Sequence, residues 1–132
     1  PDAFDIGVFN AFPKDTELCQ AGLCMVPMSG TQKQPYNDNS TIVMCSASPE
    51  GQGWHSVLGP GTALRGTPGP SQRRTIMFSP GCNKWDSLAM FGSSVIFCKT
   101  WDEVLGHLQE AHGPRAKVAV FPAGAMQTAS DR

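Results

Sequence analysis

The stretch DIGVFNAFPKDTELCQ, residues 5–20, decides the fold, because it passes from an apolar run through a turn into an amphipathic segment. Ile6, Val8 and Phe9 belong to a run with the length of a strand buried on both faces, and Pro13 ends it. Asp15 is the expected N-cap of a helix that follows. The pattern therefore predicts a strand, a turn and a helix in immediate succession.

The expected helix has one apolar face, formed at the spacing i, i+3, i+4, i+7 and i+8 by Leu18, Ala21, Gly22, Met25 and Val26. Gln20 and Leu23 lie on the other stripe. In parallel α/β sheets, ligands bind outside the carboxyl ends of the strands. We therefore expect Asn10, Lys14 and Gln20 to line a crevice where this strand meets its helix.

Four later apolar runs, residues 41–45, 75–79, 94–98 and 117–121, have the length and composition of strands. Helices are predicted over residues 83–91 and from a capping box, Thr100 with Glu103, to Gly113. This alternation predicts an α/β fold, with a Rossmann-like parallel sheet of about five strands and helices on both faces. Residues 1–132 then make a single domain.

A second strand-to-loop junction follows residue 45, in the sequence SASPEGQGWH at residues 46–55. Because parallel strands end at one edge of a sheet, Glu50 and His55 are expected beside the first junction. His55 is either a ligand-binding residue or an ordinary surface histidine. The polar segment 31–40 is expected to be a surface loop. The Gly- and Pro-rich segment 57–72 is expected to be a lid or an irregular crossover.

Composition excludes several classes of function. The 132 residues carry a net charge of −1 with no basic stripe, so the sequence does not indicate nucleic-acid binding. No apolar run approaches the roughly 20 residues of a membrane-spanning helix. The amino-terminal end lacks the features of a signal peptide, so we expect a cytoplasmic protein. Because the chain enters a strand directly after Pro1, we expect it to be part of a longer protein.

The five cysteines, Cys19, Cys24, Cys45, Cys82 and Cys98, are scattered and form no CxxC pair. We therefore expect reduced thiols and no metal site. The sequence also contains no GxSxG, Walker or GxGxxG motif. Two hypotheses remain: an enzyme half-site that closes on a cofactor held elsewhere, and a non-catalytic module that binds a small molecule or a protein.

Three segments together resemble the C-terminal domain of the nickel-pincer lactate racemase family: NAFPKDTELCQ at 10–20, TIVMCSASPEGQGWH at 41–55, and SVIFCKTWDEVLGHLQEAHGPRAKVAVFPAGAMQ at 94–127. The resemblance spans nearly the whole chain, and the segments keep their order and spacing. It favours the enzyme hypothesis over the binding module.

The resemblance implies a two-domain isomerase. Its N-terminal domain would carry the nickel pyridinium pincer cofactor, the nickel-ligating histidine and the acid/base histidines, none of which this chain contains. The reaction would transfer a hydride between a 2-hydroxy acid and the cofactor. This chain would enclose the site without catalytic residues of its own, so by itself it is expected to be inactive and to hold no cofactor.

The family pattern on the first helix of this domain is an aromatic residue, a Gln and, three residues later, a Lys. Here these positions hold Cys19, Gln20 and Leu23. Gln20 is therefore the expected contact to substrate or cofactor, whereas Leu23 cannot supply the positive charge. Lys14, in the preceding turn, is the candidate to replace that charge. The change implies a different 2-hydroxy acid or a member that has lost activity.

Overall fold

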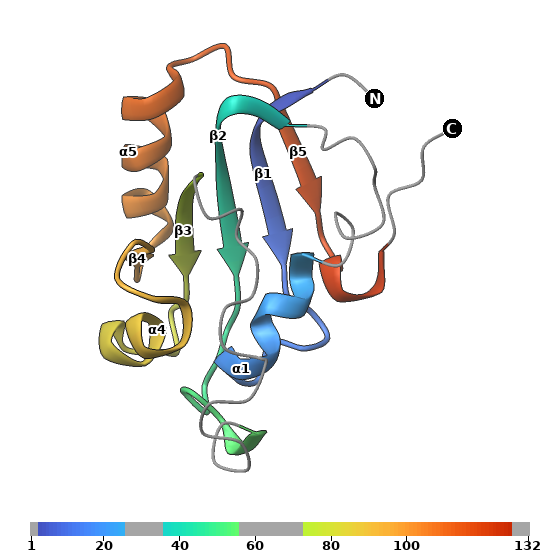
Figure 1. The fold of residues 1–132 in the computed structure, drawn as a ribbon, viewed down its shortest axis with the longest axis vertical. Helices are drawn as coiled ribbons and strands as arrows, with labels where there is room; N and C mark the ends of the chain where they lie inside the picture. Colours follow the sequence, from blue (N-terminus) through green and yellow to red (C-terminus); the bar gives the residue numbers. More distant parts are fainter. Residues whose placement is uncertain (1–2, 26–35, 56–72, 128–132) are drawn as a thin grey trace.

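Five parallel strands form the centre of the molecule, in the order β4-β3-β2-β1-β5 (Figure 1). This computed structural model describes residues 3–25, 36–55 and 73–127. The strands are β1 (Phe4–Asn10), β2 (Tyr36–Cys45), β3 (Arg74–Phe78), β4 (Ile96–Cys98) and β5 (Val118–Phe121). All neighbouring pairs are parallel. The predicted α/β fold with its five-stranded parallel sheet is confirmed.

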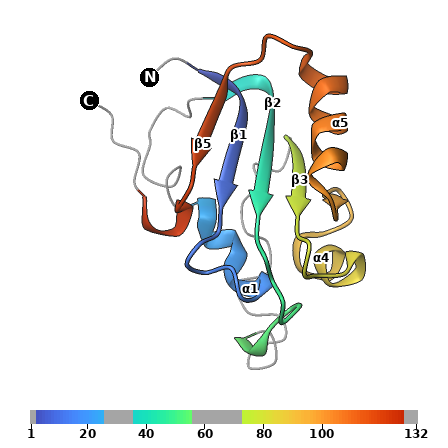
Figure 2. The same ribbon diagram turned by 180° about the vertical axis from the view of Figure 1, so that it is seen from behind.

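Helices cover both faces of this sheet, as the sequence predicts. On one face, α1 (Leu18–Ala21), the 3-10 helix η1 (Gly22–Met25) and α4 (Lys84–Phe91) enclose a core that includes Phe9, Ile42, Met44 and Met77. On the other face, α5 (Trp101–His112) packs its Val104 and Leu108 against Val43 and Ile76. Figure 2 shows the sheet from behind, with α5 beside β3. A second 3-10 helix, η2 (Gly124–Met126), follows β5.

The first helix differs from the prediction at its start. Glu17, not Asp15, occupies the N-cap, in an extended conformation with φ −144° and ψ 147°. The Asp15 carbonyl accepts a hydrogen bond from the Ser48 backbone N–H at 2.7 Å, so this residue runs beside the loop after β2 instead of entering the helix. Leu18, Ala21, Gly22 and Met25 are buried as expected. Val26 lies outside the described residues.

Strand β2 begins at Tyr36, five residues before the predicted start at Thr41, so residues 36–40 are not the surface loop that was expected. The Tyr36 ring packs edge-on against Phe4, with ring centroids 4.9 Å apart, and the Arg73 guanidinium lies 4.8 Å above it. These contacts bury Tyr36 and extend the strand. The Gly- and Pro-rich segment 57–72 lies outside the described residues.

The capping box of α5 forms as predicted. The Thr100 hydroxyl accepts a hydrogen bond from the Glu103 backbone N–H at 3.3 Å, and the Glu103 carboxylate accepts one from the Thr100 backbone N–H at 3.0 Å. The backbone N–H of Lys99 also donates to Glu103, at 2.7 Å. In the described parts of the chain, no helix combines the length and apolar character needed to cross a bilayer.

We expect Thr100→Ala to lower the free energy of unfolding by about 1 kcal/mol, because it removes one half of this box. Urea denaturation followed by far-ultraviolet circular dichroism measures the change. Ser94→Ala, in the exposed turn before β4, is the matched control and should have little effect. Equal stabilities of the Thr100 and Ser94 variants would contradict a stabilising box.

Candidate functional site

The carboxyl ends of the strands meet at one edge of the sheet, as Figure 1 shows by the common direction of the arrows. In the strand register, Asn10 pairs with Cys45, and Cys45 pairs with Phe78. The segments after β1 and β2 therefore leave the sheet side by side. This is the arrangement that the sequence predicts for the two strand-to-loop junctions.

Backbone hydrogen bonds join the two segments over their whole length. The N–H groups of Ser48 and Glu50 donate to the carbonyls of Asp15 and Thr16, at 2.7 and 3.1 Å. In the opposite direction, the N–H groups of Leu18 and Cys19 donate to the carbonyls of Gly51 and Gln52, at 2.9 and 3.3 Å. We call this arrangement the junction ladder. It fixes the start of α1 against the loop that carries His55.

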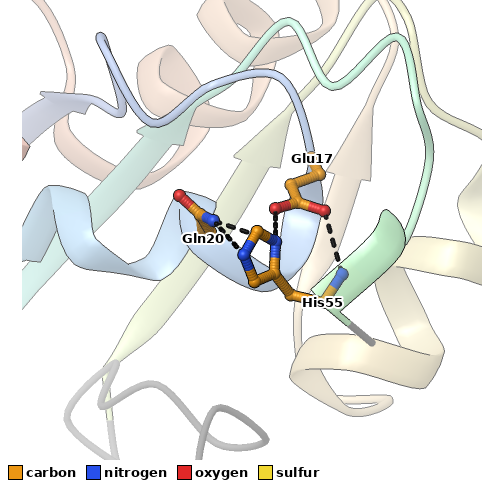
Figure 3. Close-up of polar contacts among 3 residues, drawn as sticks. All are labelled: Glu17, Gln20 and His55. Atoms are coloured by element: carbon orange, nitrogen blue, oxygen red, sulfur yellow. Dashed lines mark hydrogen bonds and ion pairs between the residues drawn. The ribbon is translucent and has the colours of Figure 1, made fainter. Parts of the chain in front are cut away.

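Glu17, Gln20 and His55 form a polar cluster at the end of this ladder (Figure 3). The His55 ring donates from Nδ1 to Glu17 Oε1, and the His55 backbone N–H donates to Glu17 Oε2 at 3.3 Å. The Gln20 side-chain nitrogen lies 3.0 Å from His55 Nδ1 and 3.2 Å from His55 Nε2. With the Nδ1 proton directed at Glu17, Nε2 is the nitrogen that accepts from Gln20.

The Glu17 carboxylate is buried, with 3% of the residue exposed, whereas the His55 side chain is 48% exposed. Burial acts to raise the pKa of Glu17. Hydrogen bonds from the His55 backbone, from the Cys19 side chain and from the His55 ring outweigh burial and hold this pKa below its ordinary value of 4.5. Glu17 is therefore a fixed negative charge beneath an accessible imidazole.

Gly53 makes room for this carboxylate. Its φ of +87° lies in a region that residues with side chains rarely adopt, and a Cβ atom there would fall 1.9 Å from Glu17 Oε2. The lack of a side chain at Gly53 therefore lets the Glu17 carboxylate lie against the backbone of this loop.

The predicted site residues lie in three places. Gln20 and His55 contact each other directly. Asn10 accepts a hydrogen bond from the Phe12 N–H at 3.2 Å through its side-chain oxygen, while Lys14 and Glu50 are exposed at the sheet edge. Among the hydrogen bonds of the described residues, none joins these last three side chains to Gln20 or His55.

The sequence analysis did not identify Glu17, although this residue organises the cluster. No motif marks it, because its partner His55 is 38 residues away along the chain. The available signal was a carboxylate three residues before Gln20, opposite a loop with two glycines. A carboxylate in that position was a candidate to orient a ligand-binding residue.

On the α5 side of the sheet there is a separate hollow of about 800 Å³. Its walls are largely apolar, and its rim reaches Asn10 and Asp15 at the carboxyl edge of the sheet. Two of its wall residues, Val118 and Val120 of β5, are 54% and 62% exposed. The hollow exists because α5 packs over β3 and β4 and leaves this face of β5 exposed.

None of the five cysteines forms a disulfide, which agrees with the expectation of reduced thiols. Burial raises the pKa of Cys24 to about 12 and that of Cys45 to about 11, and it also raises the pKa of Cys82 and Cys98. These four thiols are therefore protonated at neutral pH. Cys82 packs as part of the core.

Comparison with solved structures finds a similar fold in the lactate racemase apoprotein from Thermoanaerobacterium thermosaccharolyticum. The TM-score is 0.61 at 15% sequence identity, and the match covers 98% of this chain and 36% of that one. This chain therefore corresponds in length to about a third of that protein. No protein-family model matches the sequence, and a search of curated proteins finds no match.

Gly53→Ala should destabilise the fold more than a matched glycine substitution. Gly92 has a similar φ of +89°, but no atom lies within 4 Å of a Cβ built there. Gly92→Ala therefore measures backbone strain, about 1 to 2 kcal/mol. We expect Gly53→Ala to cost roughly 2 kcal/mol more, because it displaces the Glu17 carboxylate from its hydrogen bonds. Equal costs in urea denaturation would contradict this packing.

Glu17→Gln should change how stability depends on pH. Because the folded-state pKa of Glu17 lies below 4.5, its ionised form stabilises the fold at neutral pH. This contribution is lost as the pH falls through 4.5 towards the folded-state value. We expect the free energy of unfolding to fall less between pH 7 and pH 4 in Glu17→Gln than in the wild type. An equal fall in the free energy of unfolding in Glu17→Gln and in the wild type would contradict this role of the carboxylate.

Proposed function

We infer that this chain is a domain of a lactate racemase-like enzyme that encloses a 2-hydroxy acid and a cofactor held by a partner domain of the same protein. The observation that carries this proposal is the position of Gln20. This amide lies in α1, directly after β1 at the carboxyl edge of the sheet, and His55 holds it in place. The similar fold of the lactate racemase apoprotein over nearly the whole chain supports the proposal.

Gln20 retains hydrogen-bonding capacity while it contacts His55. One N–H of its amide is used by the imidazole; among the described residues, no hydrogen bond uses the second N–H or the carbonyl oxygen, so both are proposed to meet a ligand. Glu17 fixes the His55 ring, and the His55 ring fixes the amide. A substrate hydroxyl or carboxylate placed there would meet an amide that is already oriented, which lowers the cost of ordering it.

The implied cofactor is a nickel pyridinium pincer nucleotide, which when bound would take a hydride from C2 of the substrate and return it to either face. The residues of this chain suit a closing surface for such a site. The Gln20 amide and the half-exposed His55 ring are hydrogen-bonding groups. The proposed roles of this domain are to orient the substrate and to exclude water from it.

A substrate carboxylate also needs a compensating charge. Leu23, at the position where the family has Lys, is partly exposed in η1 and offers none. Lys14, exposed in the turn between β1 and α1, is the cation of this chain proposed to replace it. Asn10 and Glu50, at the same edge, are the remaining polar groups proposed to line the closed site.

The alternative is a module that binds an apolar ligand or a protein segment without chemistry. One observation favours it: the hollow of about 800 Å³ between α5 and β5, with apolar walls and two exposed valines. A ligand there would lie against the sheet face opposite α1. Apart from Asn10, which the rim of the hollow also reaches, the two functions depend on different residues and can be tested separately.

In the longer protein that contains this domain, Gln20→Ala should reduce turnover of a 2-hydroxy acid. We expect a loss of roughly 2 to 3 kcal/mol in transition-state stabilisation, if the amide contacts the substrate mainly in the transition state. Chiral chromatography of the product measures turnover. The free energy of unfolding should change by less than about 1 kcal/mol, because Gln20 is partly exposed.

Gln109→Ala is the matched control, since this glutamine is exposed on α5 and does not contact the polar cluster. It should retain normal turnover. If the Gln20→Ala variant retains normal turnover and only its melting temperature falls, Gln20 has a structural role. The observation on which the proposal rests would then be lost. The 132-residue chain alone should show no racemisation.

A further inference from the structure

Three potential metal ligands converge at the junction ladder. Glu17, Cys19 and His55 each place one ligand atom within 4.8 Å of the ligand atoms of the other two. A carboxylate oxygen, a thiol sulfur and an imidazole nitrogen make a mixed donor set of the kind that Zn²⁺ and similar borderline cations prefer. Mg²⁺ and Ca²⁺ prefer sites built from oxygen atoms alone.

Two of the three ligands are held rigidly. Glu17 and Cys19 are buried, at 3% and 4% exposure, and they flank the first residue of α1. The Leu18 and Cys19 N–H groups are bound to the loop carbonyls of Gly51 and Gln52. The backbone that carries these two ligands is therefore fixed without a metal ion. Preorganisation of this kind lowers the cost of assembling a metal site.

The third ligand can adjust. Ligand atoms around one zinc ion lie roughly 3 to 4 Å apart, given metal–ligand distances of about 2.0 to 2.3 Å. The ligand atoms here all lie within 4.8 Å of one another, and His55 Nδ1 already contacts Glu17 Oε1. The His55 side chain is 48% exposed at the end of the loop, so a small rotation of its ring would bring its nitrogen into place. Its present partner, Glu17, is itself one of the ligands.

We propose that Glu17, Cys19 and His55 bind a single Zn²⁺ or chemically similar divalent cation at the carboxyl edge of the sheet. The Cys19 thiol proton leaves to solvent, the proton of the His55 ring moves from Nδ1 to Nε2 so that the imidazole stays neutral, and the metal binds the thiolate sulfur and Nδ1. Three protein ligands leave a fourth position for water or another exchangeable ligand. This site uses neither the partner domain nor its cofactor, so it extends beyond the proposed function.

The sequence analysis expected no metal site, since it searched for CxxC pairs and paired histidines. The three ligands here are at positions 17, 19 and 55, which is no recognised spacing. The junction ladder brings the two segments together. The competing explanation is a set of ordinary hydrogen bonds in which the buried Glu17 carboxylate accepts from the His55 ring and from the Cys19 thiol.

Titration of the metal-free 132-residue chain with Co²⁺, in a non-thiol reductant, tests the proposal. We expect saturation at one equivalent with a thiolate-to-cobalt charge-transfer band, which only a cysteine ligand produces. Zn²⁺ should abolish this band by displacing Co²⁺ and should raise the melting temperature. Cys19→Ser and His55→Ala should each weaken binding by at least about 100-fold.

Cys45→Ser and His107→Ala are the matched controls, since both residues lie outside the cluster. Both variants should bind Co²⁺ with the affinity of the wild type. His55→Ala keeps the test decisive if Cys19→Ser does not fold, because the His55 ring is half exposed. The absence of a charge-transfer band, or equal affinity in His55→Ala and the wild type, would overturn the proposal. The metal titration does not involve racemase activity, so a negative result would contradict the metal site without bearing on the proposed function.

Discussion

The junction ladder is the interaction on which the candidate site depends. Four backbone hydrogen bonds connect the segment Asp15–Cys19 to the loop after β2. Without them, Glu17 and His55 would belong to separate surface loops, and neither would have a fixed partner. The ladder holds Asp15 and Thr16 against the loop, so α1 starts at Leu18. The α-helix predicted to run to Val26 ends at Ala21, where the chain continues as the 3-10 helix η1.

The ladder also explains how a carboxylate can be buried at this edge. Glu17 loses its water but gains hydrogen bonds from the His55 ring and backbone, and these hold its pKa below the ordinary value. Gly53 supplies the space that the carboxylate occupies. His55 is oriented by Glu17 and in turn holds Gln20. The proposed enclosing role and the proposed metal site both use this charge, the first to orient an amide and the second to bind a cation.

The sequence predicted all five strands, because each contains a short apolar run, and it predicted the α5 capping box from local spacing. It missed the first five residues of β2, because residues 37–40 are polar and are held in the strand by contacts that local patterns do not show. It placed the start of α1 wrongly, since Asp15 is a good N-cap by local rules and its carbonyl is taken by a residue 33 positions away. For the site, Gln20 and His55 were predicted and do meet. Glu17 was missed, because local patterns do not encode contacts between distant segments.

Native-state hydrogen exchange tests the central claim most directly, namely that the junction ladder is one cooperative unit. The four ladder amides, those of Leu18, Cys19, Ser48 and Glu50, each donate to a carbonyl of the opposite segment. Their opening free energies should therefore be equal to one another and close to those of the amides in β1 and β2. In Glu17→Gln the four values should fall together. Independent, fast exchange of the Ser48 and Glu50 amides beside a protected sheet would contradict the account.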